Sequence, residues 1–253
     1  MAGDDTLQAT ARIALACLDL TSLNHTDTPA DIERLCQRAQ GPCGATAAVC
    51  VWPRFAALAR SLLPPHVAVA AVANFPAGGS EAERAVRDAA AIADAGAQEV
   101  DVVLPYRDLG AAPKLLAAVR RACDGLTLKV ILETGELQAD ARIDLACRIA
   151  LDAGADFLKT STGKTPVSAT PAAARRLLQA IAADPSARSR VGFKAAGGIR
   201  SVADAGIYVA LVSETLGAAA VHPRRFRIGA SGLLDDIEAV LAGRPRPAGH
   251  AAY

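Results

Sequence analysis

The sequence contains few of the residues on which several large classes of protein depend. Only 4% of its 253 residues are aromatic, and a net charge of +1 leaves no dense basic patch. Binding of nucleic acid without sequence preference needs such a patch and stacking aromatics, so the composition argues against a nucleic-acid partner. No apolar run approaches the roughly 18–20 residues of a membrane span, and the acidic N-terminus lacks a signal-peptide pattern.

Patterns typical of metal sites and disulfides are absent as well. The six cysteines form no Cys-x-x-Cys pair, so we expect buried thiols in a reducing compartment, the cytoplasm. The four histidines include no pair at the spacing of a zinc site. We therefore expect no metal and no other cofactor.

Lysine is scarce: only five of the 27 basic residues are lysines. Lys114 lies in an ordinary surface-helix pattern. Lys129, Lys159 and Lys194 lie inside apolar, β-rich segments, where a strongly hydrated side chain is unusual. What lysine offers over arginine is an amine that can lose its proton and attack a carbonyl. These positions indicate chemistry rather than surface charge.

Short β-rich segments alternate eight times with helical patterns rich in Ala, Leu and Arg. This predicts an α/β fold, a TIM (β/α)8 barrel, as a single domain over residues 1–253 with a short N-terminal helix and a flexible tail from about residue 244. An open doubly wound sheet is the alternative, but no Gly-x-Gly-x-x-Gly turn follows the first strand. The predicted strands are 16–20, 46–51, 67–73, 99–104, 127–132, 156–160, 191–195 and 226–229.

Capping residues and glycines predict where the helices begin and end. A hydroxyl side chain before a proline or before an acidic third residue satisfies free N–H groups of the first turn. Gly96 and Gly154, each between alanines, indicate helix ends. The predicted helix starts are Thr28-Pro29, Ser80 with Glu83, Thr170-Pro171, Ser201 and Gly232.

Strand alternation places charged residues on one face of several predicted strands. In a barrel this face points inward, and the catalytic end lies at the C-terminal ends of the strands. A buried structural ion-pair network is the alternative, since inward lysines and aspartates have to pair. Two neighbouring ammonium groups repel, however, and a nearby cation with desolvation lowers the pKa of an amine. The expected cluster is Asp19, Asp101, Lys129, Lys159 and Lys194.

Glycine-rich segments follow the last three predicted strands, at residues 161–164, 196–200 and 229–232. TIM barrels often bind phosphate at the final loops, with backbone N–H groups and a helix N-terminus as donors. Lys164 and Arg200 would add positive charge. We therefore expect a phosphate-bearing substrate at this rim.

These motifs, in this order, make the sequence resemble the deoxyribose-phosphate aldolase family. The resemblance implies reversible class I cleavage of 2-deoxy-D-ribose 5-phosphate to acetaldehyde and D-glyceraldehyde 3-phosphate through a lysine Schiff base. The partners would be small phosphosugars and aldehydes, and the sequence allows a homo-oligomer. The most specific motifs are Lys129-Val-Ile-Leu-Glu-Thr-Gly-Glu136, Phe157-Leu-Lys-Thr-Ser-Thr-Gly-Lys164, Gly192-Phe-Lys-Ala-Ala-Gly-Gly198 and Gly229-Ala-Ser231.

The resemblance also implies roles for individual residues. Lys159 matches the Schiff-base lysine, Lys194 the second lysine that perturbs its amine, and Asp101 the proton donor and acceptor. Tyr253 matches a terminal tyrosine with a role in enamine protonation; the alternative is an incidental tail residue. The residues expected to bind the substrate or its phosphate are Asp19, Thr21, Cys50, Thr162, Lys164, Gly197, Gly198, Arg200, Gly229 and Ser231.

Two positions depart from the family pattern. Ala195 stands where a proline is common, and Gly232 replaces a serine, which removes a hydroxyl donor but keeps a backbone N–H. Three rival functions stay open. They are a different Schiff-base aldolase, a phosphosugar isomerase that would need no Lys159, and a phosphosugar-binding protein that would need no lysine of lowered pKa.

Overall fold

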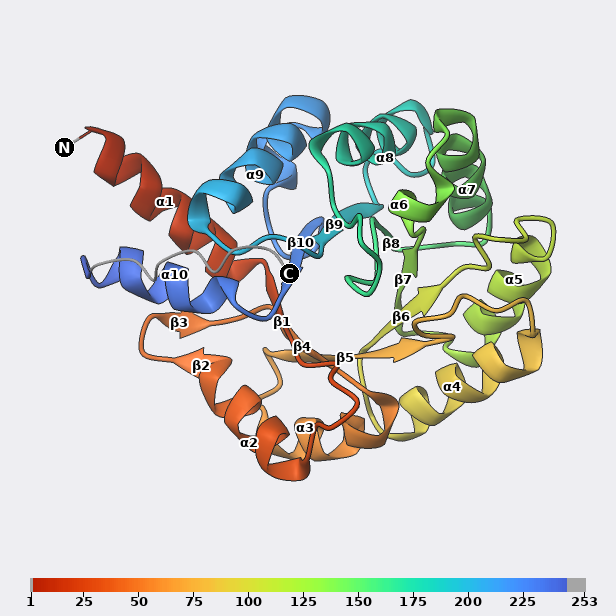
Figure 1. Ribbon diagram of the computed structural model, residues 1–253, viewed down its shortest axis with the longest axis horizontal. Coiled ribbons are helices and arrows are strands. Elements are labelled where there is room, and N and C mark those ends of the chain that lie inside the picture. The colour runs from red at the N-terminus through yellow and green to blue at the C-terminus, as the bar shows by residue number, and fades with distance from the viewer. Residues whose placement is uncertain (1, 245–253) are drawn as a thin grey trace.

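The computed structural model describes residues 2–244, which form a closed barrel of parallel strands surrounded by helices (Figure 1). The predicted (β/α)8 barrel is confirmed. Each strand pairs with the next barrel strand along the chain, and the last one closes the barrel against the first. The barrel strands are β1 (Leu18–Thr21), β4 (Ala48–Val51), β5 (Ala68–Ala73), β6 (Glu99–Val103), β7 (Thr127–Ile131), β8 (Phe157–Lys159), β9 (Gly192–Ala196) and β10 (Phe226–Ala230).

Helices follow the strands and cover the outside of the barrel (Figure 1). A two-stranded hairpin, β2 (Gln40–Gly41) with β3 (Gly44–Ala45), precedes β4. The first helix packs against the last two long helices, so the two ends of the described chain meet on one side of the barrel. The helices are α1 (Ala2–Ala16), α2 (Pro29–Arg38), η1 (Pro53–Phe55), α3 (Ala56–Leu62), α4 (Ala82–Asp94), α5 (Ala112–Ala122), α6 (Thr134–Leu137), α7 (Asp140–Asp152), α8 (Pro171–Ala183), α9 (Val202–Leu216), η2 (Ala218–Ala220) and α10 (Leu233–Leu241).

Most of the predicted helix signals are confirmed. Thr28, Thr170 and Ser201 each cap the first turn of the helix that follows, through a hydroxyl that accepts a backbone N–H bond. The capping box predicted at Ser80 is wrong. Helix α4 begins later, with Glu81 at its N-cap and no side-chain cap, because the Ser80 hydroxyl donates instead to the Asp108 carboxylate.

The cysteines follow the predicted pattern with one exception. Those at positions 17, 36, 50, 123 and 147 are buried free thiols. Cys43 is exposed, because it lies in the turn between β2 and β3, which projects from the barrel surface. Within residues 2–244, no helix is both long and apolar enough to cross a membrane.

Side chains alternate along each strand between an apolar outer core and the barrel interior. Outward residues such as Val100, Leu128 and Phe193 pack in the core shared with the helices. The interior holds few large apolar side chains. Phe157, which pairs with Lys129 in the strand register, is one of them, and the Arg227 guanidinium lies over its ring, 5.6 Å from the ring centroid. The ring fits because its neighbour on β9 is Gly192, which has no side chain.

This close packing predicts that Gly192→Ala destabilises the barrel. An added Cβ would lie 2.3 Å from a Phe157 ring carbon and 2.8 Å from the Arg225 carbonyl oxygen, so the ring and the backbone would both have to move. We expect the free energy of unfolding, measured by urea denaturation, to fall by about 1–3 kcal/mol.

The matched control is Gly206→Ala on α9. Its Cβ would lie 3.5 Å from the nearest atom, a Thr10 methyl carbon, which is an ordinary contact. Alanine favours a helix over glycine, so this variant should gain roughly 0.5–1 kcal/mol. Equal effects of the two substitutions would contradict the packing argument.

Candidate active site

Seven charged side chains fill the interior of the barrel. All are at least nine-tenths buried, and they come from six different strands. Charges this deeply buried are stable only when they pair. The carboxylates are Asp19, Glu99 and Asp101, and the cations are Lys129, Lys159, Lys194 and Arg227.

Asp101 on β6 joins the three lysines. Its Oδ2 atom lies 2.7 Å from the Lys159 Nζ and 2.8 Å from the Lys194 Nζ, while its Oδ1 atom lies 2.7 Å from the Lys129 Nζ. The sequence predicted that Lys159 and Lys194 lie together and repel each other. Both Nζ atoms do contact the same oxygen atom, Asp101 Oδ2. The negative charge of Asp101 lies between the two lysines, however, and offsets their repulsion.

Sequence reasoning missed two members of this cluster. The Glu99 carboxylate lies 2.5 Å from the Lys129 Nζ and 2.7 Å from the Arg227 Nη2, and Arg227 also bonds Asp19 at 2.6 Å. Strand alternation could have identified Glu99, because it shares its face of β6 with Asp101. Arg227 was missed because three arginines lie close together at positions 224, 225 and 227, and the sequence does not show that the side chain of Arg227 points into the barrel.

The three buried lysines differ in how many carboxylates they contact. Lys129 contacts three (Asp19, Glu99 and Asp101), Lys194 contacts two, and Lys159 contacts Asp101 alone. An ammonium group with fewer carboxylate partners loses its proton more readily. The number of carboxylate partners therefore identifies Lys159 as the lysine that loses its proton most readily. The residue pattern alone did not show which lysine this would be.

The pKa shifts follow the same order. Burial, with a smaller contribution from the Lys194 cation, lowers the pKa of Lys159 despite the opposing charge of Asp101. Burial also disfavours the charge on Lys194, but Asp101 and Asp19 outweigh it and raise the pKa of Lys194. The same balance, with Asp101 and Glu99 as partners, raises the pKa of Lys129. Lys159 is thus the buried amine that most readily becomes a neutral nucleophile.

Asp101 and Asp19 stay ionised inside this cluster. Burial alone would raise the pKa of Asp101, but Lys129, Lys159 and Lys194 outweigh it and hold that pKa well below its usual value. The pKa of Asp19 is lowered as well, since Lys194 and Arg227 outweigh its burial. Asp101 can therefore stabilise a positive charge on Lys159 or relay a proton, but it does not retain one.

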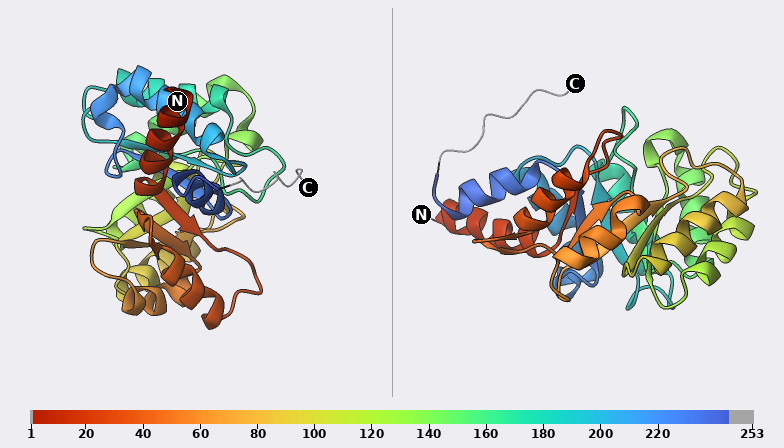
Figure 2. Two further views of the ribbon diagram at one scale, coloured as in Figure 1. Left: turned by 90° about the vertical axis from the view of Figure 1, so that its left-hand side faces the viewer. Right: turned by 90° about the horizontal axis from the view of Figure 1, so that it is seen from below.

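A pocket of about 1060 Å³ opens above this cluster, at the C-terminal ends of β1, β8, β9 and β10. The β1–α2 and β8–α8 segments project from the barrel on this side (Figure 2). Of the buried lysines, only Lys159 lines the pocket. A small carbonyl compound in the pocket would therefore meet the Lys159 amine first.

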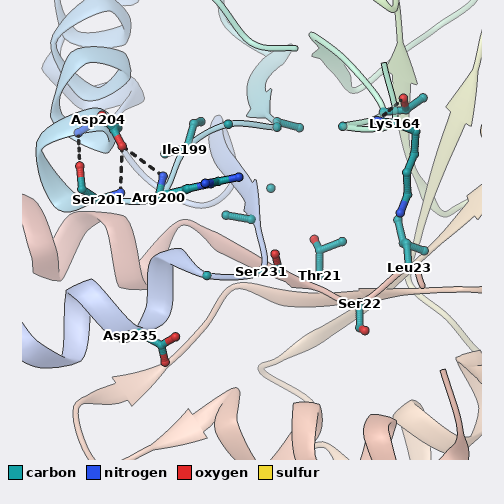
Figure 3. A pocket seen from close by; sticks show the side chains of 18 of the residues that line it. Thr21, Ser22, Leu23, Lys164, Ile199, Arg200, Ser201, Asp204, Ser231 and Asp235 are labelled. Atoms are coloured by element: carbon teal, nitrogen blue, oxygen red, sulfur yellow. Dashed lines mark hydrogen bonds between the residues drawn. The ribbon is translucent and has the colours of Figure 1, made fainter. Parts of the chain in front are cut away.

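The rim of the pocket carries most of the predicted substrate-binding residues. Lys164 and Arg200 come from opposite sides, with Thr21 and Ser231 between them (Figure 3). The backbone of Gly197, Gly198 and Gly229 also lines the pocket. Cations and hydroxyls are thus gathered within one pocket that also reaches Lys159, an arrangement suited to a ligand that has a carbonyl at one end and an anion at the other.

The remaining predicted site residues are placed differently. Asp19 and Cys50 are fully buried beneath the pocket and do not line it, and burial raises the pKa of the Cys50 thiol. Thr162 lines the pocket, but its hydroxyl donates to the Glu133 carboxylate. Tyr253 lies outside the described residues.

The donor set offers no metal site. Within residues 2–244, no group of three or more His, Cys, Asp or Glu side chains is arranged to hold a metal ion. The three interior carboxylates, Asp19, Glu99 and Asp101, contact four cations.

Comparison with known proteins identifies the family. Residues 13–236 match the family model described as DeoC/LacD family aldolase. Over 241 residues and 92% of both chains, the sequence is 46% identical to the deoxyribose-phosphate aldolase of Agrobacterium fabrum.

Solved structures agree in fold. A putative deoxyribose-phosphate aldolase from Toxoplasma gondii aligns with a TM-score of 0.85 at 24% identity, covering 96% of this chain and 97% of that one. The tetrameric deoxyribose phosphate aldolase of Aeropyrum pernix aligns with a TM-score of 0.74 at 26% identity, covering 94% and 97%. The chain therefore belongs to the DeoC/LacD family of aldolases, and it is similar over most of its length to deoxyribose-phosphate aldolases.

Proposed function

We propose that this aldolase cleaves 2-deoxy-D-ribose 5-phosphate reversibly into acetaldehyde and D-glyceraldehyde 3-phosphate through a Schiff base on Lys159. The observation that carries the proposal is the position of Lys159. It is the buried lysine that reaches the pocket, and it has the fewest carboxylate partners. The activity of the relatives supports the substrate.

The reaction begins at the neutral Lys159 amine. It attacks the C1 aldehyde of the open-chain sugar, and the carbinolamine loses water to give a protonated imine. The C3 hydroxyl then loses its proton, the C2–C3 bond breaks, and its electron pair moves toward the imine. Glyceraldehyde 3-phosphate leaves, and an enamine stays on Lys159. Protonation of that enamine at carbon and hydrolysis release acetaldehyde.

The neighbours of Lys159 stabilise the charge of the imine and transfer protons. The Asp101 carboxylate, 2.7 Å from the Lys159 Nζ, stabilises the positive charge of the imine. Lys194 keeps its proton, because Asp101 and Asp19 adjoin it, and so it can donate and recover a proton during turnover. We assign the proton transfers to Asp101, Lys194 and bound water. Tyr253 stays a proposed contributor to enamine protonation.

The proposed phosphate site lies on the rim between Lys164, Arg200 and Ser231. Helix α9 offers little to an anion, because Asp204 and Asp236 already accept the N–H bonds of residues 200–202. Helix α10 differs: its N-cap, Gly232, supplies no side-chain bond to the first turn. We therefore place the phosphate near the start of α10, where backbone N–H groups and the helix dipole favour an anion.

Two wider expectations accompany this proposal. The tetramer of the Aeropyrum pernix relative supports a homo-oligomer, which sedimentation would test. A phosphorylated sugar is retained inside cells, and the cysteines of residues 2–244 are free thiols, so we propose that the enzyme acts in the cytoplasm.

Borohydride trapping with acetaldehyde tests the Schiff base. Reduction of the imine should attach an ethyl group irreversibly to Lys159, as located by peptide mass spectrometry. Lys159→Ala should abolish this site-specific label. Lys194→Ala should retain it but slow its formation near neutral pH, because loss of the neighbouring cation raises the pKa of Lys159.

Lys164→Ala is the matched control, since Lys164 is exposed on the rim and contributes no buried charge. It should label as the wild type does. Absence of any label at Lys159 in the wild-type enzyme would overturn the proposed mechanism and favour an isomerase or a binding protein.

The buried charge balance predicts opposite pH shifts from two neighbouring substitutions. The rate of borohydride labelling should rise with pH as Lys159 loses its proton, and this rise is the acid limb of its pH profile. Glu99→Gln removes a negative charge, which lowers the pKa of Lys159 and moves the acid limb to lower pH. Arg227→Met removes a positive charge and moves that limb to higher pH. Each shift should be on the order of one pH unit.

The double variant with both Glu99→Gln and Arg227→Met removes an ion pair and leaves the net charge unchanged. Its acid limb should return close to that of the wild type. Circular dichroism and urea denaturation would confirm folding, because each single variant removes one partner from two buried charges. Shifts of the same sign in both single variants would contradict the charge-balance account.

A further inference from the structure

Glu133 is a buried carboxylate that the mechanism above does not use. It is the second residue after β7 and is fully buried, and its φ angle of 55° lies in the left-handed region that residues other than glycine rarely adopt. A buried carboxylate in such a backbone conformation is costly unless its contacts compensate. Those contacts therefore indicate its role.

Its contacts converge on one segment, residues 161–168 between β8 and α8. The Thr162 hydroxyl donates to Glu133 at 2.5 Å, the Thr162 backbone N–H at 3.3 Å, and the Thr165 hydroxyl at 3.2 Å. Thr162 in turn holds the backbone of Lys164, because its hydroxyl oxygen accepts a hydrogen bond from the Lys164 N–H at 3.0 Å. One carboxylate thus fixes the backbone on both sides of Gly163.

Two glycines hold the same segment from either side. A Cβ on Gly135, just after Glu133, would lie 2.1 Å from the Val167 carbonyl oxygen. A Cβ on Gly197, on the rim after β9, would lie 2.5 Å from the Ser168 Cβ. The segment that carries Lys164 is therefore packed between the ends of β7 and β9, with Glu133 bonded to its centre.

Glu133 lies apart from the seven-charge cluster. Its hydrogen-bond partners are the two threonines, and Lys159 is the member of the cluster that acts on it electrostatically. Burial raises the pKa of Glu133, and the bonds from Thr162 and Thr165 oppose that rise. The carboxylate is thus placed to order the rim rather than to react.

We propose that Glu133 is a positioning residue that determines the preference for phosphorylated substrates, by holding Thr162 and Lys164 where they meet the phosphate. This inference rests on the proposed function. It implies that the phosphate end of the pocket can be weakened without disturbing the chemistry at Lys159, since the contacts of Glu133 are with the rim segment.

Steady-state kinetics of Glu133→Gln with two substrates test the inference. The amide keeps the size of the carboxylate but cannot accept all three N–H and O–H donors. With 2-deoxyribose 5-phosphate, KM should rise roughly tenfold or more with little change in kcat. With unphosphorylated 2-deoxyribose, and in borohydride trapping with acetaldehyde, the variant should match the wild type at a pH where Lys159 is neutral in both proteins, so that loss of the Glu133 charge near Lys159 does not affect the comparison.

Two further variants keep the test decisive. Thr165→Val removes one donor to Glu133 with less disturbance of the interior and should show a smaller rise in KM for the phosphorylated sugar alone. Glu136→Gln is the matched control, because it removes an exposed carboxylate from the same short helix, α6. It should leave the kinetics with both substrates unchanged.

The outcomes separate this inference from the proposed function. Equal losses for both sugars in Glu133→Gln and Thr165→Val, or no change with either sugar, would overturn the role of Glu133 while the wild-type enzyme still traps acetaldehyde. If the wild-type enzyme neither traps acetaldehyde nor cleaves the phosphorylated sugar, the proposed function fails and this inference fails with it.

Discussion

The sharing of one carboxylate by three lysines is the interaction on which the site depends. Asp101 contacts Lys129, Lys159 and Lys194 through its two oxygen atoms. The three ammonium groups therefore share the single negative charge of this carboxylate. Lys129 and Lys194 compensate with other carboxylates, and Lys159 does not. Unequal access to negative charge, among three lysines that are all buried, thus lowers the pKa of Lys159 and raises the pKa of the other two. The barrel provides this inequality because neighbouring strands bring charges together in a fixed register.

The fold was largely predictable because its signals are local. Strand and helix periodicity, with hydroxyl caps at residues such as Thr28 and Ser201, located the barrel elements to within a few residues. The predictions that failed concerned residues whose structure depends on tertiary contacts. Ser80 carries a helix-start signal, but its hydroxyl donates to the Asp108 carboxylate of the next β–α connection instead of capping the helix. The hairpin β2–β3 is too short to produce a periodic pattern.

The sequence predicted most of the residues that meet in the barrel interior, but not which of them contact one another. Alternation along strands placed Asp101, Lys159 and Lys194 on inward faces, yet it gave no distances, and so it could not show that Asp101 lies between the lysines. Arg227 was missed, because the sequence does not reveal which of the arginines at positions 224, 225 and 227 points into the barrel. Glu133 gave no sign of its role, since its partners lie about 30 residues further along the chain.

The most direct test of this account is a titration of the lysine side chains by NMR on protein labelled with ¹⁵N-lysine, which carries only five such nitrogens. Single lysine variants would assign the resonances. The account predicts that Lys159 titrates below the usual lysine value of about 10.4. It also predicts that Lys129 and Lys194 keep their protons beyond that pH. Titration of Lys194 before Lys159 would contradict it.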